Sequence, residues 1–408
     1  MSIDDADYAL FCQQQLQNPY PMFAQLREAD PVHWCEPLKT WLLTRYEDVF
    51  QGLRDTQRLS TSREAMYTDP LLPENRDRAR LLIDHIGRWL LNVDPPDHTR
   101  MRKLINLAFT PRMLRGMVPR IEQIVGQRLD RMVPMGDCDF IEMFCLPLPA
   151  IVICDMLGIP AQLQEKYCRC VEGLLPFSSG AGPGLNAAID SANAELTQLI
   201  ALFDELVESR RREPGEDLIS AMTAVEADGA RLSREELFAM CVFLFLAGHE
   251  TTAGLLASGT LALLQHPDQW ELLKSDPDGL VDSAVEEFLR YDASVTRGAR
   301  RALCDFTLHG RQIEQGQTLT HLIGAANRDP AVFHDPDRLD ITRDPNEHLA
   351  FGHGIHFCIG APLARIEAQI AFRAIVARFP NLQLAADTVE YKPALGIRSL
   401  KTLPVRLV

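Results

Sequence analysis

One long helix, predicted between Ser233 and His266, constrains the fold of this chain more than any other feature. Ser233 and Glu236 form a capping-box signature in front of an apolar run, and His266-Pro267 is the next stop signal. At 1.5 Å per residue, a helix of about 32 residues is ~48 Å long, so we expect it to cross the whole molecule. Its middle, residues 247–252, is small and polar, and polar groups at such a depth need partners or a function.

The rest of the pattern predicts a mainly α protein with a minor β region. We expect one domain over residues 1–408, with 1–17 as a loose N-terminal segment, because no repeat or long linker divides the chain. The pattern predicts a long loop with a helical turn at 56–95, irregular stretches at 177–184 and 330–348, a hairpin formed by 32–34 and 41–44, and strands at 306–308 and 318–323. Further helices are predicted at 23–29, 97–109, 120–132, 141–157, 161–174, 187–212, 280–291 and 362–378.

Composition excludes several classes of protein. The chain has 408 residues, 46% hydrophobic and 24% charged, which are ordinary globular values. Its net charge of −15 argues against a general affinity for nucleic acid. The acidic N-terminus lacks the features of a signal peptide, and the longest apolar run, 238–248, is too short to span a bilayer. Ten cysteines, none in a CxxC pair, fit a reducing compartment without a structural metal site. We therefore expect a soluble cytoplasmic protein without a membrane anchor.

The strongest chemical signal is Cys358, which lies between glycines directly in front of a predicted helix. Glycines let the backbone approach a flat ligand closely, and the start of the 362–378 helix directs N–H groups and positive potential at the sulfur. Both effects favour a thiolate, and a thiolate in such a setting is a suitable axial ligand for haem iron.

Residues 351–360 match the pattern F-x-x-G-x-H-x-C-x-G, and in this the chain resembles the soluble bacterial members of the cytochrome P450 family. The resemblance extends from about Asn18 to Val408. It implies the cytochrome P450 fold, haem b as the cofactor, and Cys358 as the axial ligand of the iron.

Two further motifs agree with the family. Glu287 and Arg290 form its E-x-x-R pair, which the family buries together with an arginine from the following coil, and Arg338 occupies the position expected for that arginine. We assign these three residues to structure. Residues 247–252 match the oxygen-activation segment. There the resemblance implies that Ala247 and Gly248 leave room for O₂, that Thr251 donates a hydrogen bond, and that Glu250 relays protons.

The two propionates of haem need cationic partners when they are buried. By resemblance, His98 and Arg102 supply them from the start of the 97–109 helix, where i,i+4 spacing puts both on one face. Arg300 and His356 are the other candidates. Arg297 and Arg301 lie close to Arg300 in the sequence, so either could replace it.

The resemblance implies a monooxygenase that hydroxylates or epoxidises an apolar small molecule. Without a flavin or nicotinamide segment, the chain would take electrons from an external ferredoxin and its reductase, and we expect a monomer. Two alternatives stay open: a peroxide-using enzyme of the same superfamily, against which the Glu250-Thr251 pair argues, and a non-catalytic haem sensor. The segments that set specificity in the family suggest an apolar pocket that would suit fatty acids, terpenoids, steroids or macrolides; they carry Met66, Leu90, Leu91, Leu174, Phe177, Leu244, Val295 and Ile397.

Overall fold

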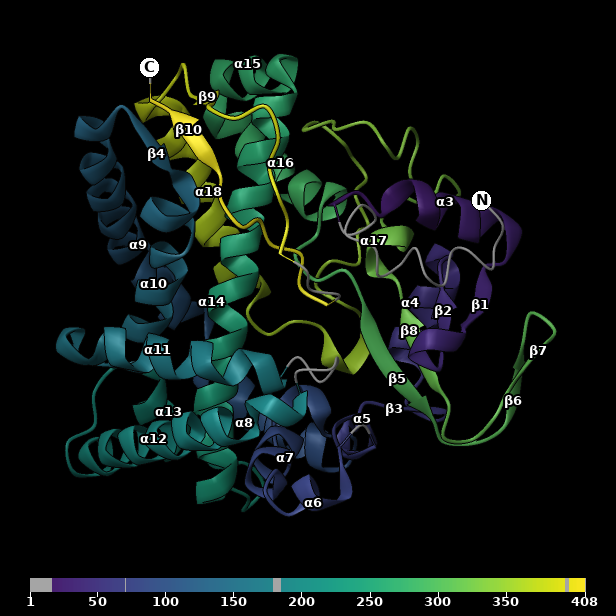
Figure 1. Cartoon of the computed structure of the whole chain (residues 1–408). Coiled ribbons are helices and arrows are strands. Elements are labelled where there is room, and N and C mark those ends of the chain that lie inside the picture. Colours follow the sequence, from purple (N-terminus) through teal and green to yellow (C-terminus); the bar gives the residue numbers. More distant parts are fainter. Residues whose placement is uncertain (1–16, 70, 179–184, 393–395, 408) are drawn as a thin grey trace. The chain divides into compact units, whose positions relative to one another are not determined.

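A computed structural model describes residues 17–69, 71–178, 185–392 and 396–407 (Figure 1). It is mainly helical with a small β region, which confirms the predicted fold class. The chain forms two compact units: residues 1–60, 118–149 and 250–408 make unit 1, and residues 61–117 and 150–249 make unit 2. The prediction of one domain over 1–408 stays a prediction. The segment 1–17, expected to be loose, lies outside the described residues except for Gln17.

Unit 1 contains a five-stranded sheet in the order β1-β2-β8-β5-β3 (Figure 1). The strands are β1 Val32–Cys35, β2 Thr40–Leu43, β3 Leu59–Ser60, β5 Gly298–Ala302 and β8 Thr318–His321. β1 and β2 pair antiparallel, which confirms the predicted hairpin, and β2 runs parallel to β8. The sequence analysis missed β5, because Gly-Ala-Arg-Arg-Ala carries neither the alternation nor the β-branched residues of a typical strand.

The other strands of unit 1 form two smaller sheets, β4-β10-β9 and the hairpin β6-β7. Their bounds are β4 Asp137–Asp139, β6 Phe306–Leu308, β7 Arg311–Ile313, β9 Gln383–Leu384 and β10 Pro404–Arg406. The helices that belong to unit 1 are α3 Tyr20–Ala29, α4 Tyr46–Arg54, α15 Pro267–Ser275, α16 Pro277–Tyr291, α17 Ile323–Ala326 and α18 Ala361–Arg378, with shorter turns η1 Glu36–Leu38, η3 Val133–Met135, η4 Ile141–Cys145 and η5 Gly354–His356.

Unit 2 is helical. Its helices are α5 Glu64–Thr68, α6 Pro73–Arg76, α7 Arg80–Gly87, α8 Asp97–Ala108, α11 Ala161–Ser178, α12 Leu185–Arg212 and α13 Leu218–Ala224, with the turn η2 Leu90–Asn92. α11 and α12 lie side by side (Figure 1). Between them the rings of Tyr167 and Phe203 meet edge to face, with their centroids 4.9 Å apart. The prediction of a long loop with one helical turn at 56–95 was wrong in extent, because this stretch contains α5, α6, α7 and η2. α5 and α6 have only five and four residues, too few to show a helical period, whereas the eight residues of α7 bury Leu82, Ile83 and Ile86 on one side and were overlooked.

Three helices contribute residues to both units: α9 Pro111–Met132, α10 Pro147–Leu157 and α14 Arg234–Gln265. α14 is the predicted long helix, with 32 residues. The capping box is confirmed, since the Ser233 N–H donates to Glu236 Oε2 at 2.8 Å and the Glu236 N–H donates to Ser233 Oγ at 3.1 Å.

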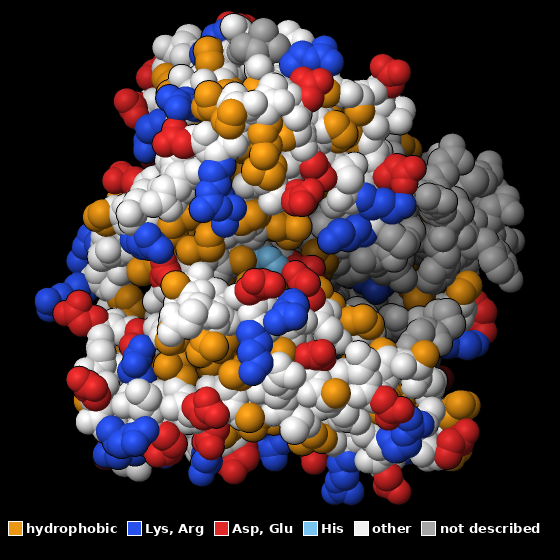
Figure 2. Space-filling model, turned by 60° about the vertical axis from the view of Figure 1, so that its left-hand side comes forward, with side chains coloured by type: hydrophobic (Ala, Val, Ile, Leu, Met, Phe, Trp, Pro, Cys, Tyr) orange, Lys and Arg blue, Asp and Glu red, His pale blue; other side chains and the backbone are white. Residues whose placement is uncertain are grey.

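In the described part of the chain, α14 has the length and composition to cross a membrane, as would the bent pair of 141–157 and 161–177 if it acted as one span. However, 67% of the most apolar window of α14 is buried within the protein, as in the core helix of a soluble protein, so it is weak evidence for a span. On the face in Figure 2, basic and acidic side chains are interspersed, and no extended basic stripe of the kind that binds nucleic acid is visible there.

Within unit 1, α14 packs closely against α16 and α18. A side chain added at Gly259 of α14 would place its Cβ 2.6 Å from Phe372 of α18 and 2.9 Å from Phe288 of α16. The rings of Phe288 and Phe372 are themselves 4.8 Å apart. This three-helix contact fixes α18, whose first turn follows the predicted iron ligand.

Candidate active site

The loop that carries Cys358 is held by its own backbone. The Cys358 N–H donates to the carbonyl of Phe351 at 2.9 Å, and the Cys358 carbonyl accepts from the N–H of Ala361, the first residue of α18, at 3.4 Å. Gly352 and Gly354 have φ values of +69° and +72°, a region that side-chain-bearing residues rarely adopt. Cys358 is therefore half-buried at the end of a tight loop and at the start of a helix, as the sequence predicts.

The donor set in this part of unit 1 fits haem. A cysteine sulfur at a helix N-terminus is a soft anionic ligand suited to iron, and Arg300 and His356 are cationic or hydrogen-bonding groups suited to propionates. Arg300 lies in β5 and is 7% exposed, and His356 is half-buried in η5.

The strand geometry separates Arg300 from its neighbours. Successive side chains of a strand point to opposite faces, so Arg301 cannot share the face of Arg300. Arg301 extends toward the turn at Gly316, where its Nη2 lies 3.4 Å from the position of an added Cβ. Arg297 is half-buried and precedes the strand. Of the three, Arg300 is the buried arginine, which favours it as the propionate partner.

His321 of β8 is a neighbour of Arg300 that the sequence analysis missed. Burial, together with the Arg300 charge, lowers the pKa of His321 to about 3, so its imidazole is neutral at pH 7. Its Nδ1 lies 3.3 Å from the Gly298 carbonyl, which can only accept, so Nδ1 carries the proton. The ring fits because Gly52 has no side chain; an added Cβ there would lie 2.0 Å from His321 Nε2. The feature of the sequence that could have indicated this contact is Gly52, a glycine inside helix α4.

In unit 2, α8 carries the other two predicted propionate residues. His98 is 2% exposed, and burial, with the charge of Arg102, lowers its pKa. This influence is consistent with the two side chains sharing one face of α8. Arg100 points elsewhere and pairs with Glu236 at the start of α14.

The predicted oxygen-activation residues all lie in α14, and Ala247, Gly248, Glu250 and Thr251 are half-buried. An added Cβ at Gly248 would lie 3.3 Å from Ile153 Cδ1 of α10, so this glycine also serves the packing of two helices in unit 2. Its role in leaving room for O₂ stays a prediction.

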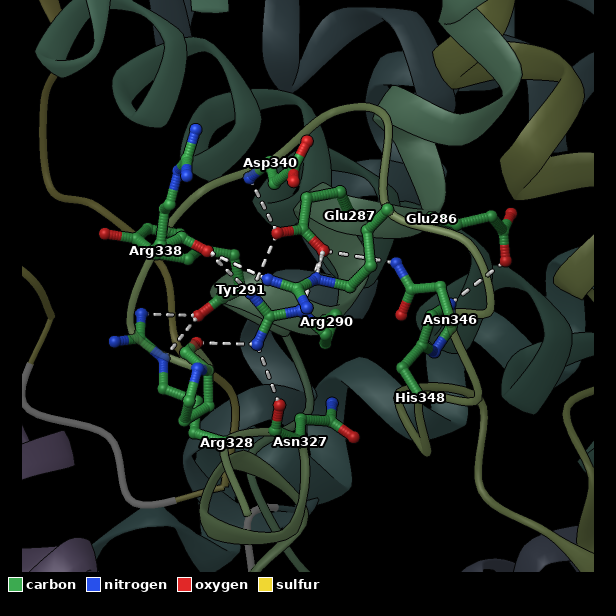
Figure 3. A network of polar contacts seen from close by, with 12 residues as sticks. Glu286, Glu287, Arg290, Tyr291, Asn327, Arg328, Arg338, Asp340, Asn346 and His348 are labelled. Carbon is green, nitrogen blue, oxygen red and sulfur yellow. Dashed lines mark hydrogen bonds and ion pairs between the residues drawn. The ribbon is translucent and has the colours of Figure 1, made fainter. Parts of the chain in front are cut away.

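Glu287 is the centre of a buried polar network (Figure 3). Its side chain and that of Arg290 are both 0% exposed, and the two groups form a bidentate pair at 2.7 and 2.8 Å. Glu287 also accepts from Asp340 N–H at 2.9 Å, Arg343 Nε at 3.1 Å and Asn346 Nδ2 at 3.2 Å. A buried carboxylate with this many donors is fully compensated.

The predicted third member of this network was wrong. Arg338 contributes its carbonyl oxygen, which accepts from Arg290 Nη2 at 3.1 Å, whereas the guanidinium beside Glu287 belongs to Arg343. The Arg343 side chain is 10% exposed. The coil turns between the two arginines, and the motif alone could not show which one turns inward.

A second cluster lies beside the first, around Glu286 (Figure 3). Glu286 accepts from Arg365 Nε at 2.6 Å and Nη2 at 2.8 Å, and His348 Nε2 lies 3.0 Å away. Burial alone would raise the pKa of Glu286, but Arg365 and His348 lower it to about 2. Arg365 in turn lies over the ring of Phe351, with its Cζ 4.6 Å from the centroid. This cluster therefore links α16 and α18 to the first residue of the Cys358 loop.

The correction to the third arginine can be tested by comparing two variants. Arg343→Gln removes a charged hydrogen bond to buried Glu287, so we expect the free energy of unfolding to fall by about 1.5–3 kcal/mol. Arg338→Gln leaves the backbone carbonyl in place and changes an exposed side chain, so we expect a change within about 0.5 kcal/mol. Urea unfolding of both haem-loaded variants provides the measurement. Equal losses would contradict the assignment of Arg343.

Comparisons with known proteins agree with this site. Residues 279–397, which include Glu287 and Cys358, match the family model described as cytochrome P450. The chain is 39% identical over 404 residues to the polyketide biosynthesis cytochrome P450 PksS of Bacillus subtilis, covering 96% of each chain. It is 40% identical over 397 residues to the vitamin D(3) 25-hydroxylase of Pseudonocardia autotrophica, covering 96% of this chain and 94% of that protein.

Among solved structures, P450BioI in complex with an acyl carrier protein ligated to hexadec-9Z-enoic acid matches with a TM-score of 0.89 and 36% identity, over 97% of this chain and 99% of that one. Similarity of this extent, together with the cysteine loop and the buried Glu287–Arg290 pair, shows that the chain belongs to the cytochrome P450 family of haem-thiolate monooxygenases.

Proposed function

We propose that this monooxygenase inserts one oxygen atom of O₂ into an apolar small molecule, in the cytoplasm, with electrons from a ferredoxin and its reductase. The observation that carries the proposal is the adjacent acid and alcohol, Glu250 and Thr251, half-buried in the long helix α14. An acid that can exchange protons and a hydroxyl that can donate a hydrogen bond are the groups that proton-dependent use of O₂ needs. An enzyme supplied with peroxide has less need of them.

Each candidate residue has a separate role in this proposal. Haem, when bound, supplies the iron at which O₂ reacts. The Cys358 thiolate would hold that iron. Arg300 and His356 of unit 1 are suited to a propionate, and so, in unit 2, are His98 and Arg102. Glu250 carries protons, and the Thr251 hydroxyl directs them toward cleavage of the O–O bond.

The activities for which several relatives are named support an apolar substrate of considerable size. These relatives include a polyketide biosynthesis enzyme, a vitamin D(3) hydroxylase and a 6-deoxyerythronolide B hydroxylase. In this chain, Leu90, Leu174 and Leu244 of unit 2 are buried apolar residues, and Val295 pairs with Ile397 in unit 1. A difference-spectrum screen of fatty acids, terpenoids, steroids and macrolides would identify the class.

The electron source is tested by comparing two supplies. With a ferredoxin, its reductase and NADPH, we expect turnover of a screened substrate and one product per NADPH in the coupled limit. With hydrogen peroxide alone, we expect much slower turnover, because Glu250 and Thr251 serve a proton-consuming route. Product formation is followed by mass spectrometry. Faster turnover with peroxide than with the redox partners would favour the peroxide-using alternative.

Cys358→His tests the iron ligand. A neutral imidazole cannot donate electrons to iron as a thiolate does, so we expect the red-shifted carbonyl absorption band that names the family to disappear, even where haem is retained. The measurement is the absorption spectrum of the reduced, CO-treated protein. Cys304→Ser, at an exposed cysteine elsewhere in unit 1, should keep the band. An unchanged carbonyl band in Cys358→His would contradict the assignment of Cys358 as the iron ligand.

Thr251→Ala tests the proposed proton delivery. It removes the hydroxyl together with one methyl group and adds neither charge nor bulk, so haem binding and the substrate-induced spin shift should persist. NADPH consumption should continue while product falls and hydrogen peroxide rises, because protons are no longer directed toward O–O cleavage. Glu250→Gln should instead slow NADPH consumption itself, since proton supply then limits the cycle. Full coupling of NADPH to product in Thr251→Ala would contradict the role of Thr251.

A further inference from the structure

Ser294 lies in the segment that follows α16 and contacts α14 at the proposed site. Its hydroxyl donates to the backbone carbonyl of Thr251 at 2.8 Å, and the residue is 7% exposed. A main-chain carbonyl inside a helix ordinarily needs only the N–H four residues later. The bond from Ser294 is therefore an additional constraint on the backbone of the residue that carries the proposed hydrogen-bond donor.

Gly254 makes this contact possible. An added Cβ at Gly254 would lie 2.6 Å from Ser294 Oγ, 3.0 Å from Ser294 Cβ and 3.3 Å from the Arg398 carbonyl. Any side chain here would displace the Ser294 hydroxyl from its position. The missing side chain, one turn after Thr251, thus lets a second segment of the chain approach α14.

The backbone of Ser294 is itself firmly held. Its carbonyl accepts from the Arg398 N–H at 2.7 Å. The Arg398 guanidinium binds Asp292 at 2.6 Å, and the Tyr391 hydroxyl donates to the same carboxylate at 2.9 Å. Burial opposes ionisation of Asp292, but Arg398 and the hydrogen bonds of Tyr20 and Tyr391 keep its pKa below the usual value. Ser294 is therefore fixed to a charged, hydrogen-bonded anchor.

We propose that Ser294 is a positioning residue for Thr251, acting through the Thr251 carbonyl. The position of a threonine hydroxyl in a helix depends on which of two side-chain rotamers it adopts and on where the backbone places its Cα. By holding the Thr251 carbonyl from outside the helix, Ser294 fixes the backbone from which the Thr251 hydroxyl extends. This inference rests on the proposed role of Thr251 in proton delivery.

Ser258 provides a matched control. It lies in α14, it is 6% exposed, and its hydroxyl donates to the Asp292 carbonyl at 3.1 Å. Ser258→Ala therefore removes the same kind of bond between the same two segments without touching the Thr251 carbonyl. Ser294→Ala removes the proposed contact directly. In Gly254→Ala residue 294 is still a serine, but the added methyl group displaces its hydroxyl.

The holoenzyme variants are compared by two measurements. The first is the ratio of hydrogen peroxide to product during NADPH-driven turnover. The second is the infrared C–O stretch of the reduced, CO-treated protein, which responds to polar groups beside the iron and does not require turnover. Ser294→Ala and Gly254→Ala should raise the ratio of hydrogen peroxide to product about fivefold, because the net free energy of one hydrogen bond corresponds to about that factor. Both variants should also broaden the C–O band. Ser258→Ala should change neither.

The outcomes separate this inference from the function on which it rests. If Thr251→Ala raises peroxide but Ser294→Ala matches Ser258→Ala in both measurements, the positioning role of Ser294 is overturned and the role of Thr251 stands. If Thr251→Ala stays coupled, the proposed proton delivery fails and this inference fails with it. Recovery of the wild-type ratio and band in Ser294→Thr, which retains a hydroxyl, would support a positioning role over a general loss of packing.

Discussion

The buried carboxylate of Glu287 is the interaction on which the rest of unit 1 depends. A charge with no solvent exposure must collect donors, and apart from Arg290 of the same helix those donors come from a coil with no regular secondary structure of its own. Arg290 extends the network by donating to the carbonyls of Asn327 and Pro336. The path of the coil is therefore set by the needs of one ion pair in α16.

The same network reaches the cysteine loop in two steps. Arg290 binds the Asn327 carbonyl, and the Asn327 side chain accepts from the Leu349 N–H at 2.7 Å. Two residues later, the Phe351 carbonyl accepts from Cys358. Adjacent residues of α16 thus reach the loop by different routes, Glu287 through the coil and Glu286 through Arg365 and the ring of Phe351. The Glu287–Arg290 ion pair takes no part in the chemistry, but through these contacts it determines where the iron ligand lies.

The sequence alone predicted the features that have a local signature. The capping box of α14, the β1-β2 hairpin and the start of α18 each depend on residues close together in the chain. Features that depend on tertiary contacts were missed or wrong. Arg338 and Arg343 lie five residues apart in a coil, so no periodicity could tell which faces Glu287. Ser294 and Thr251 are separated by 43 positions, and neither residue type predicts a contact between them.

The glycine at position 52 has a consequence for how this protein can be stabilised. Exchanging a helical glycine for alanine commonly adds about 0.4–1 kcal/mol by restricting the unfolded chain. Gly116 and Gly126 of α9 have nothing within 4 Å of an added Cβ, so α9 accepts such an exchange. Gly52 does not, because its empty space holds the neutral imidazole of His321 beside Arg300. Sequence-based rules for thermostabilisation treat these three glycines alike. Gly52 lowers the stability of its helix, but it leaves the space that His321 needs beside the buried charge of Arg300.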